Sequence, residues 1–206
     1  MSKLVLVIAQ SGTGKSSSLR NFKKGEANVI LCSGKELPFR SELGALVPKN
    51  YGDIMGAIAN APAPVVVIDD ANYLMSFEEM SRVNEVGYAK FTQMAANMFK
   101  MFKAIIDKPG DQIFYVMAHA ETREDNLLRF KTTGKMLSDK IVLEGLTNVV
   151  LTTEIVDGKF VFRTATDGTG VKSPLGMFKT PTMDNDLKEA DKLIREFYTP
   201  VTKKEK

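Results

Sequence analysis

The sequence predicts an α/β protein built on an open, mainly parallel sheet with helices on both faces. Four apolar runs alternate along the chain with segments of helical spacing, at residues 4–9, 28–32, 65–70 and 112–118. The third run begins with four aliphatic residues and no polar alternation, which is typical of a parallel strand that helices cover on both faces. This order of elements favours an open α/β sheet with its functional site at the carboxyl ends of the strands.

Helical spacing and turn signals predict the elements between these strands. A short helix at residues 16–22 should end at Lys23-Lys24-Gly25, because cations and a glycine mark a helix C-terminus. Apolar residues repeat at helical spacing over residues 51–60. They repeat again over residues 76–108, as one long or two shorter helices whose methionines and phenylalanines we expect in the core. Residues 33–50 carry two prolines and two glycines and should form a loop with at most a turn of helix.

The last third of the chain should add a hairpin and a terminal helix. Residues 120–134 are polar and predict a loop or a hairpin, and helical spacing resumes after them. Asp157-Gly158 is a strong hairpin signal between two apolar runs, so we expect an antiparallel ribbon there. The elements expected in this part are a helix at 135–146, strands at 148–155 and 160–166, a glycine-rich loop at 167–177 and an amphipathic helix at 184–198.

Length and composition limit the class of protein. The chain has 206 residues, 44% of them hydrophobic, so we expect one domain over residues 1–180, followed by an amphipathic helix and basic tail at 181–206. No apolar run approaches the ~20 residues that cross a bilayer, and the N-terminus does not read as a signal peptide, so we expect no membrane partner and a cytoplasmic location. The single cysteine, Cys32, excludes an internal disulfide and should be buried, and a net charge of +3 neither requires nor excludes nucleic acid.

The most specific motif follows the first apolar run directly and reads Ala-Gln-Ser-Gly-Thr-Gly-Lys-Ser over residues 9–16. It matches the phosphate-loop pattern G-x-x-x-x-G-K-[ST] except at its first position. The glycines let backbone N–H groups turn around a phosphate, the lysine supplies charge to the β and γ phosphates, and the last serine offers its hydroxyl to Mg²⁺. The N-terminus of the following helix should add partial positive charge. We therefore expect ATP or GTP with Mg²⁺ to bind at Gln10, Ser11, Gly12, Thr13, Gly14, Lys15, Ser16 and Ser17.

Candidate catalytic side chains stand where the predicted strands end. Asp69 follows four aliphatic residues, as expected of the carboxylate that holds Mg²⁺ through water beside Ser16. Asp70 could polarise an attacking water or act as an outer acid behind Asp69. His119 could report the state of the γ-phosphate, or it could be an ordinary histidine at the rim of the core. Glu36 could activate a water molecule, or it could be a solvent-exposed glutamate.

Basic residues in and after the segment that begins at His119 form a candidate nucleic-acid surface. Their cations could contact the phosphates of single-stranded DNA, and the aromatic residue among them could stack a base, although a solvated basic face would have the same composition. These candidates are Arg123, Arg129, Phe130, Lys131 and Lys135. Lys172, in the glycine-rich loop, is a candidate catalytic cation for the nucleotide of a neighbouring subunit.

The order of these motifs resembles the RecA-like ATPase core. The chain is most similar to the short phage-encoded ATP-binding proteins of that class, some of which act as single-strand annealing recombinases. The resemblance covers about residues 3–178. Beside the phosphate loop and the strand that ends at Asp69, it includes three stretches: Met117-Ala118-His119 at the place of a polar sensor, Thr132-Thr133-Gly134-Lys135-Met136-Leu137 at the end of a DNA-binding loop, and Thr169-Gly170-Val171-Lys172-Ser173-Pro174 at a segment that reaches the adjacent subunit's ATP.

This resemblance implies a RecA-like P-loop NTPase fold, an ATPase that uses Mg²⁺, and single-stranded DNA as a partner. It also implies self-association as a ring or short filament, phage recombination or replication proteins as partners, and the cytoplasm of a bacterial host as the location. Other classes stay open. An AAA-type helicase loader, or a nucleotide-binding accessory protein with little hydrolysis, would share the phosphate loop. So would a nucleotide kinase, which also needs an arginine-rich lid.

Overall fold

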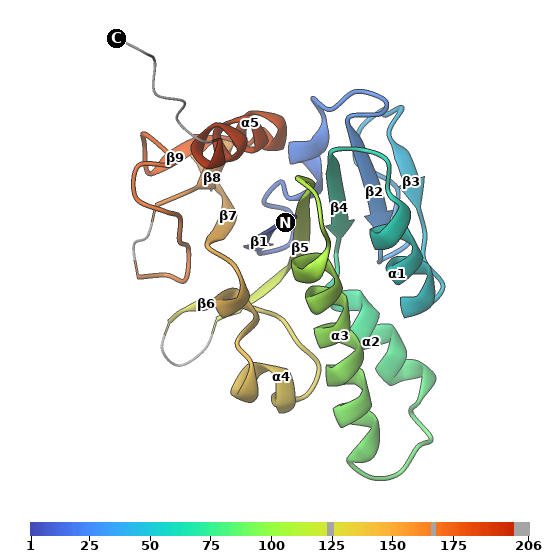
Figure 1. Cartoon of the computed structure of the whole chain (residues 1–206). Coiled ribbons are helices and arrows are strands. Elements are labelled where there is room, and N and C mark those ends of the chain that lie inside the picture. The colour runs from blue at the N-terminus through green and yellow to red at the C-terminus, as the bar shows by residue number, and fades with distance from the viewer. Residues whose placement is uncertain (123–125, 166–167, 200–206) are drawn as a thin grey trace.

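A computed structural model describes residues 1–122, 126–165 and 168–199, which form one mixed sheet of nine strands with helices on both faces (Figure 1). The strands follow the order β3-β2-β4-β5-β1-β7-β8-β9, and β6 pairs with the end of β5. The pairs from β3 to β7 are parallel, whereas β6, β8 and β9 are antiparallel to their neighbours. The open, mainly parallel α/β sheet is therefore confirmed. The strands are β1 (Lys3–Ala9), β2 (Ala27–Leu31), β3 (Gly44–Leu46), β4 (Val65–Asp69), β5 (Ile113–Thr122), β6 (Leu128–Phe130), β7 (Val149–Val156), β8 (Lys159–Arg163) and β9 (Thr182–Asp184).

Helices cover both faces of this sheet. Helices α1 to α4 pack on one face, while α5 and the short 3₁₀ helix η1 pack on the other. Figure 1 shows α5 at the end of the sheet formed by β8 and β9, away from the edge strand β3. The helices are α1 (Tyr51–Asn60), α2 (Asn72–Ser81), α3 (Ala89–Asp107), α4 (Lys135–Lys140), α5 (Leu187–Tyr198), η1 (Ser16–Leu19) and a second 3₁₀ helix, η2 (Leu143–Leu146).

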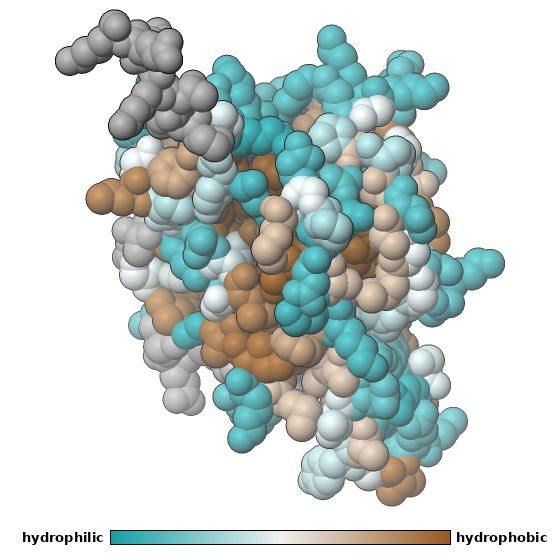
Figure 2. Space-filling model, in the orientation of Figure 1, coloured by the Kyte–Doolittle hydropathy of each residue, from teal (hydrophilic) through white to brown (hydrophobic). Residues whose placement is uncertain are grey.

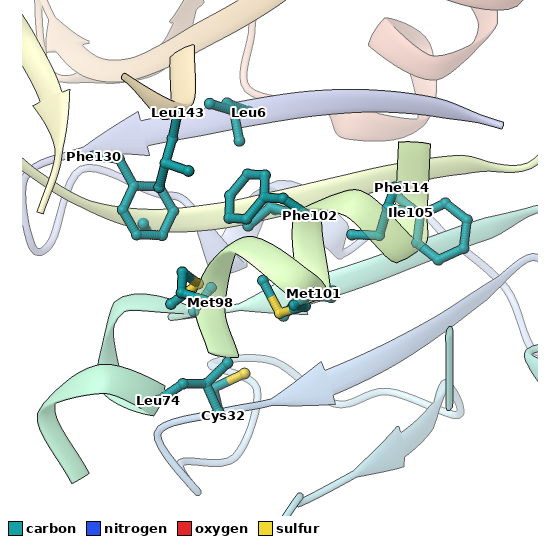
Figure 3. Close-up of a cluster of buried hydrophobic side chains, with 14 of the residues drawn as sticks. Leu6, Cys32, Leu74, Met98, Met101, Phe102, Ile105, Phe114, Phe130 and Leu143 are labelled. Carbon is teal, nitrogen blue, oxygen red and sulfur yellow. The ribbon is translucent and has the colours of Figure 1, made fainter. Parts of the chain in front are cut away.

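The two hydrophobic clusters follow the alternation of side chains along each strand. In β1, Leu6 and Ile8 belong to the cluster under α1 to α4, and Val5 and Val7 belong to the cluster under α5. Most of the methionines and phenylalanines predicted for the core are confirmed there, since Met94, Met98, Met101 and Phe102 are fully buried, whereas Phe91 is only partly buried. Figure 3 shows Met98, Met101 and Phe102 of α3 within the first cluster, close to strand residues such as Phe114.

Half-buried hydrophobic residues extend the first cluster toward the surface, among them Phe91, Phe99, Ile141 and Leu146. On the face drawn in Figure 2, hydrophobic residues gather near the centre and hydrophilic residues surround them. Cys32 is buried, as its apolar surroundings predict. Within the ranges described above, no helix is long and apolar enough to cross a membrane.

Several elements differ from the sequence-based expectation. The helix expected at residues 16–22 is only the four-residue η1, because residues 20–25 form turns. The loop expected at residues 33–50 contains the edge strand β3, which is short enough to escape pattern recognition. Residues 76–108 form two helices, and the first begins four residues earlier than expected, at Asn72. Residues 135–146 are interrupted at Val142, whose positive φ of 51° ends the helix.

The hairpin expected at Asp157-Gly158 is present, and residues 120–134, expected as a loop or a hairpin, contain a second one. At the tip between β7 and β8, Asp157 and Gly158 have φ of 50° and 75°, the left-handed values that a two-residue hairpin turn requires. Strand β5 continues past His119 and pairs with β6, so the polar segment after it returns as the second hairpin.

The parallel register brings the ends of three strands together. Ala9 at the end of β1 pairs with His119 of β5, and Leu31 at the end of β2 pairs with Asp69 of β4. Because β5 lies between β1 and β4, His119 lies between the loop that follows β1 and the two aspartates at the end of β4, Asp69 and Asp70. The candidate site is therefore assembled by the sheet itself.

Candidate functional site

A cavity of about 260 Å³ opens where β1, β2 and β4 end, beside His119 of β5. It unites most of the residues that the sequence singles out, drawn from four separate stretches of the chain. Of the predicted catalytic residues, Lys15, Glu36, Asp70 and His119 line it, together with the predicted metal ligands Ser16 and Asp69. The remaining lining residues are Ser11, Gly12, Gly14, Ser17, Ser33, Lys35, Pro38 and Phe160.

The glycine loop, residues 10–17, wraps one side of the cavity. Gly12 and Gly14 have φ of 79° and 101°, which a residue with a Cβ adopts only under strain. Gln10 and Thr13 instead line a neighbouring hollow, where the Thr13 hydroxyl donates to the Gln10 carbonyl oxygen at 2.8 Å and lies 2.7 Å from the Thr153 hydroxyl. The Thr13 side chain therefore anchors the loop to β7 through Thr153, while Gly12 and Gly14 line the cavity.

The positive charge of the Lys15 ammonium group is only partly neutralised by the neighbouring carboxylates. The side chain is 6% exposed, and its Nζ lies 3.9 Å from Oδ1 of Asp70. Burial lowers its pKa, although Asp70 and Asp69 oppose that shift. A buried cation with such a distant counterion is prepared for an anionic ligand. The four residues of η1 are too few for a strong helix dipole, so Lys15 and the loop N–H groups supply most of the positive potential.

Ser16 and Asp69 form the pair predicted to hold a divalent cation. The Ser16 hydroxyl donates to Oδ2 of Asp69 at 2.6 Å, while the buried Oδ1 has no hydrogen-bond partner among the described residues. Burial raises the pKa of Asp69. A divalent cation would satisfy both requirements, because it would coordinate the unpaired oxygen of Asp69 and compensate the buried negative charge.

Clusters of three or more His, Cys, Asp or Glu side chains that could hold a metal by themselves are absent from the described part of the chain. Mg²⁺ does not require such a cluster, because it commonly keeps several waters and binds through one or two protein ligands plus phosphate oxygens. Ser16 and Asp69 therefore suit a cation that arrives together with a polyphosphate.

Asp70 connects Lys15 to His119. Its backbone has a positive φ of 56°, an uncommon conformation for a residue with a side chain. This turn directs Oδ1 of Asp70 to 3.9 Å from Nζ of Lys15 and 3.6 Å from Nε2 of His119. Burial and the charge of Lys15 lower the pKa of His119, so the imidazole is neutral at pH 7.

The backbone of His119 is held on both sides. Its N–H donates to the side-chain oxygen of Asn72 at 3.0 Å, and its carbonyl oxygen accepts from the N–H of Lys131 at 3.0 Å. Its ring meets the edge of Tyr73 at 5.8 Å between centroids. The backbone of His119 is therefore hydrogen-bonded directly to the basic segment that follows β6.

Four lining residues are not among the predicted site residues: Ser33, Lys35, Pro38 and Phe160. Lys35 lies two residues past Ser33 in the turn after β2, where the position after a parallel strand could have suggested it. Phe160 lies on β8, far from the glycine loop in sequence, and approaches it only through the C-terminal hairpin. No local pattern marks such a contact.

The role expected of Phe130 as a base-stacking residue is wrong. Its side chain is 2% exposed and packs edge-on against Phe102 at 5.9 Å, and its N–H donates to the Glu144 carboxylate. Figure 3 shows Phe130 within the buried cluster next to Leu143. The reason is that the segment is a strand whose alternation turns this side chain into the core.

The basic candidates near Phe130 have different surroundings. Arg129 is half-buried on β6, whereas Lys131 and Lys135 are exposed. Arg123 lies outside the described residues. Two of the four predicted cations are therefore exposed, and the aromatic residue predicted with them is buried.

Lys172, predicted to act on the nucleotide of a neighbouring subunit, does not line the cavity of its own chain. Its loop is less free than its glycines suggest. Lys172 exchanges two backbone hydrogen bonds with Val150, and the Leu128 N–H donates to the Thr169 carbonyl oxygen at 2.7 Å. The loop is therefore fastened to β7 and β6.

Compared with known protein families, the chain matches none, and it matches no curated protein. The class of site follows from its geometry alone. A loop with two left-handed glycines, a buried lysine and a serine–aspartate pair together suit a polyphosphate and a divalent cation.

Proposed function

We propose that the protein is a RecA-like P-loop NTPase that binds ATP with Mg²⁺ in this cavity and hydrolyses it. The observation that carries the proposal is the convergence on one cavity of Lys15, the Ser16–Asp69 pair and the glycine loop. The order of the parallel strands supports it. Strand β5 separates β1 from β4, so the polar residue His119 lies between the phosphate loop and Asp69, the carboxylate expected to hold Mg²⁺. The resemblance to the RecA-like core likewise implies a polar sensor at His119.

Each residue has a defined task in this proposal. The glycine-loop N–H groups and Lys15 hold the β and γ phosphates, and Ser16 and Asp69 hold Mg²⁺. The metal would neutralise charge on the transferred phosphoryl group. Asp70 and Glu36 are the carboxylates of this cavity that could orient an attacking water, since both line it.

We further propose that single-stranded DNA binds the basic segment after His119 and communicates with the nucleotide. The hydrogen bond from Lys131 to the His119 carbonyl oxygen gives a direct mechanical path between the two sites. A shift of His119 toward a γ-phosphate would move the backbone that carries Lys131. Self-association as a ring or short filament, with Lys172 directed to a neighbour's nucleotide, belongs to the same proposal.

A second candidate is a nucleotide-binding protein with little hydrolysis. It is favoured by the position of Asp70, whose carboxylate faces Lys15 and His119 and so shares its charge with them. A carboxylate engaged in this way is a weaker base for water.

The experiment that tests the proposal measures ATP hydrolysis with Mg²⁺ in the presence and absence of single-stranded DNA. Stimulation by DNA, abolished in Lys15→Met, supports the ATPase. Saturable Mg²⁺–ATP binding without hydrolysis supports the second candidate. If neither binding nor hydrolysis is detected, both candidates are wrong.

A further inference from the structure

Phe160 is an exposed aromatic residue at the rim of the candidate nucleotide cavity. It is 45% exposed although it lines the cavity. A Cβ built on Gly14 would lie 3.0 Å from Cδ1 and 3.2 Å from Cγ of this ring. The aromatic ring therefore lies directly against the loop expected to hold the phosphates.

The backbone around Phe160 holds this ring in position. Phe160 pairs with Ile155 across the hairpin, and its carbonyl oxygen accepts from the N–H of Asn185 at 3.3 Å. The segment that follows β9 is tied to η1 and the turn after it, because Arg20 donates to the Asn185 carbonyl oxygen and Asn21 donates to the Asp186 carboxylate at 2.7 Å. Hydrogen bonds through the segment after β9 therefore connect the strand that carries Phe160 to the turn that follows the glycine loop and η1.

A second feature beside the ring also points to a ligand. The side chain of Asn185 is 1% exposed, and its Oδ1 lies 3.2 Å from the position of a Gly14 Cβ. Neither its amide nitrogen nor its oxygen has a hydrogen-bond partner among the described residues. An unpaired carboxamide supplies two N–H donors and an acceptor oxygen, and because Asn185 lies beside Gly14 and does not line the cavity, a ligand would act on it through the glycine loop.

We propose that Phe160 is the platform on which the base of a bound nucleoside triphosphate stacks. The inference rests on the proposed nucleotide-binding function. It identifies where the nucleobase would bind, which the phosphate loop does not explain. The cavity of about 260 Å³ is smaller than the roughly 300–1,000 Å³ of ligand pockets. The nucleoside therefore extends past the phosphates to the rim, where the exposed face of Phe160 lies.

The consequence is that the C-terminal hairpin contributes to nucleotide affinity, while the glycine loop contributes to phosphate affinity. Base–aromatic stacking changes affinity by about 5- to 150-fold when the aromatic residue is removed. Tripolyphosphate carries the phosphates without a base, so its binding should not depend on Phe160.

The test is a calorimetric comparison of Mg²⁺–ATP and Mg²⁺–tripolyphosphate on the full chain. In Phe160→Ala and in Phe160→Leu, which preserves apolar bulk, ATP binding should weaken by about 5- to 150-fold and tripolyphosphate binding should stay unchanged. Phe197→Ala is the matched control, because Phe197 is similarly exposed, at 41%, but lies on α5 and does not line the cavity. Both ligands should bind this control as they bind the wild type.

The outcomes separate the two levels of the proposal. If the wild type binds neither ligand, the proposed function fails. If it binds both but Phe160→Leu weakens neither, or weakens both equally, the platform is wrong and the ring only packs on the loop. The chain has no tryptophan, so Phe160→Trp adds a single indole whose fluorescence should change with ATP and not with tripolyphosphate.

Discussion

The Nε2 atom of His119 lies 3.6 Å from Oδ1 of Asp70. This separation is too long for a strong hydrogen bond, so the pair does not hold a proton tightly. Burial and Lys15 disfavour the imidazolium more than Asp70 favours it. His119 can therefore act as a neutral polar group that reorients when charge changes in the cavity.

The first prediction concerns the titration of this imidazole. His119 is the single histidine, so its NMR titration is unambiguous and should give a pKa below 6.5 in the folded protein. Because the unfolded chain then binds its proton at higher pH, folding stability should fall as the pH drops from 6.5 toward the folded value. Asp70→Asn removes the opposing charge and should lower this pKa further. A pKa above 6.5 would mean that Asp70 controls the imidazole.

The second prediction concerns the buried carboxylate of Asp69. Its raised pKa means that the folded state holds a proton more tightly than the unfolded chain, so the ionised group lowers stability at neutral pH. Asp69→Asn, which can still accept from Ser16, should therefore raise the melting temperature without metal. The same variant should lose the stabilisation that Mg²⁺–ATP gives the wild type. Thermal denaturation with and without Mg²⁺–ATP measures both effects, and a lower metal-free melting temperature would contradict this reasoning.

The third prediction separates backbone strain from steric conflict in the glycine-rich loop. Gly168 and Gly170 have φ of 81° and 101°, so alanine at either position should cost about 1–2 kcal/mol. A Cβ on Gly170 would also lie 2.6 Å from the Leu128 carbonyl oxygen, whereas Gly168 faces open space. Gly170→Ala should therefore lose about 1–3 kcal/mol more than Gly168→Ala in urea denaturation. Equal losses of unfolding free energy in the two variants would show that the backbone at Leu128 moves away and relieves the steric conflict.

The fourth prediction concerns the basic segment. If Lys131 contacts a DNA phosphate, the affinity for single strands should fall with salt, and Lys131→Ala should reduce that slope by up to about 0.7. Lys100→Ala, on the exposed side of α3, is the control and should leave the slope unchanged. Fluorescence anisotropy of labelled single strands at several salt concentrations, with ATP present, measures this salt dependence for each variant. A salt-independent affinity would remove DNA phosphates from the proposed function.

The sequence predicts best where one short stretch carries the information. The glycine loop, the strand that ends at Asp69 and the Asp157-Gly158 turn each follow from local chemistry, and the structure has them as expected. Parallel pairing then brings together Lys15 and His119, whose proximity depended only on the strand order.

The sequence predicts poorly where tertiary contacts decide. Phe130 lies between cations and was expected at the surface, but β6 pairs with β5 and turns it inward. Phe160 reaches the glycine loop across a hairpin, and that contact leaves no local pattern. The helix after the glycine loop is cut to η1, which helical propensity alone did not indicate.

The most direct test of the central claim is the calorimetric affinity of Mg²⁺–ATP for the wild type and for Lys15→Met. The lysine is buried and its pKa is lowered by burial, so the neutral methionine should leave the melting temperature unchanged or higher. Loss of the charged contact with phosphate should weaken ATP by roughly 10- to 150-fold. Equal affinities for the folded variant and the wild type would show that the glycine loop is not a phosphate site.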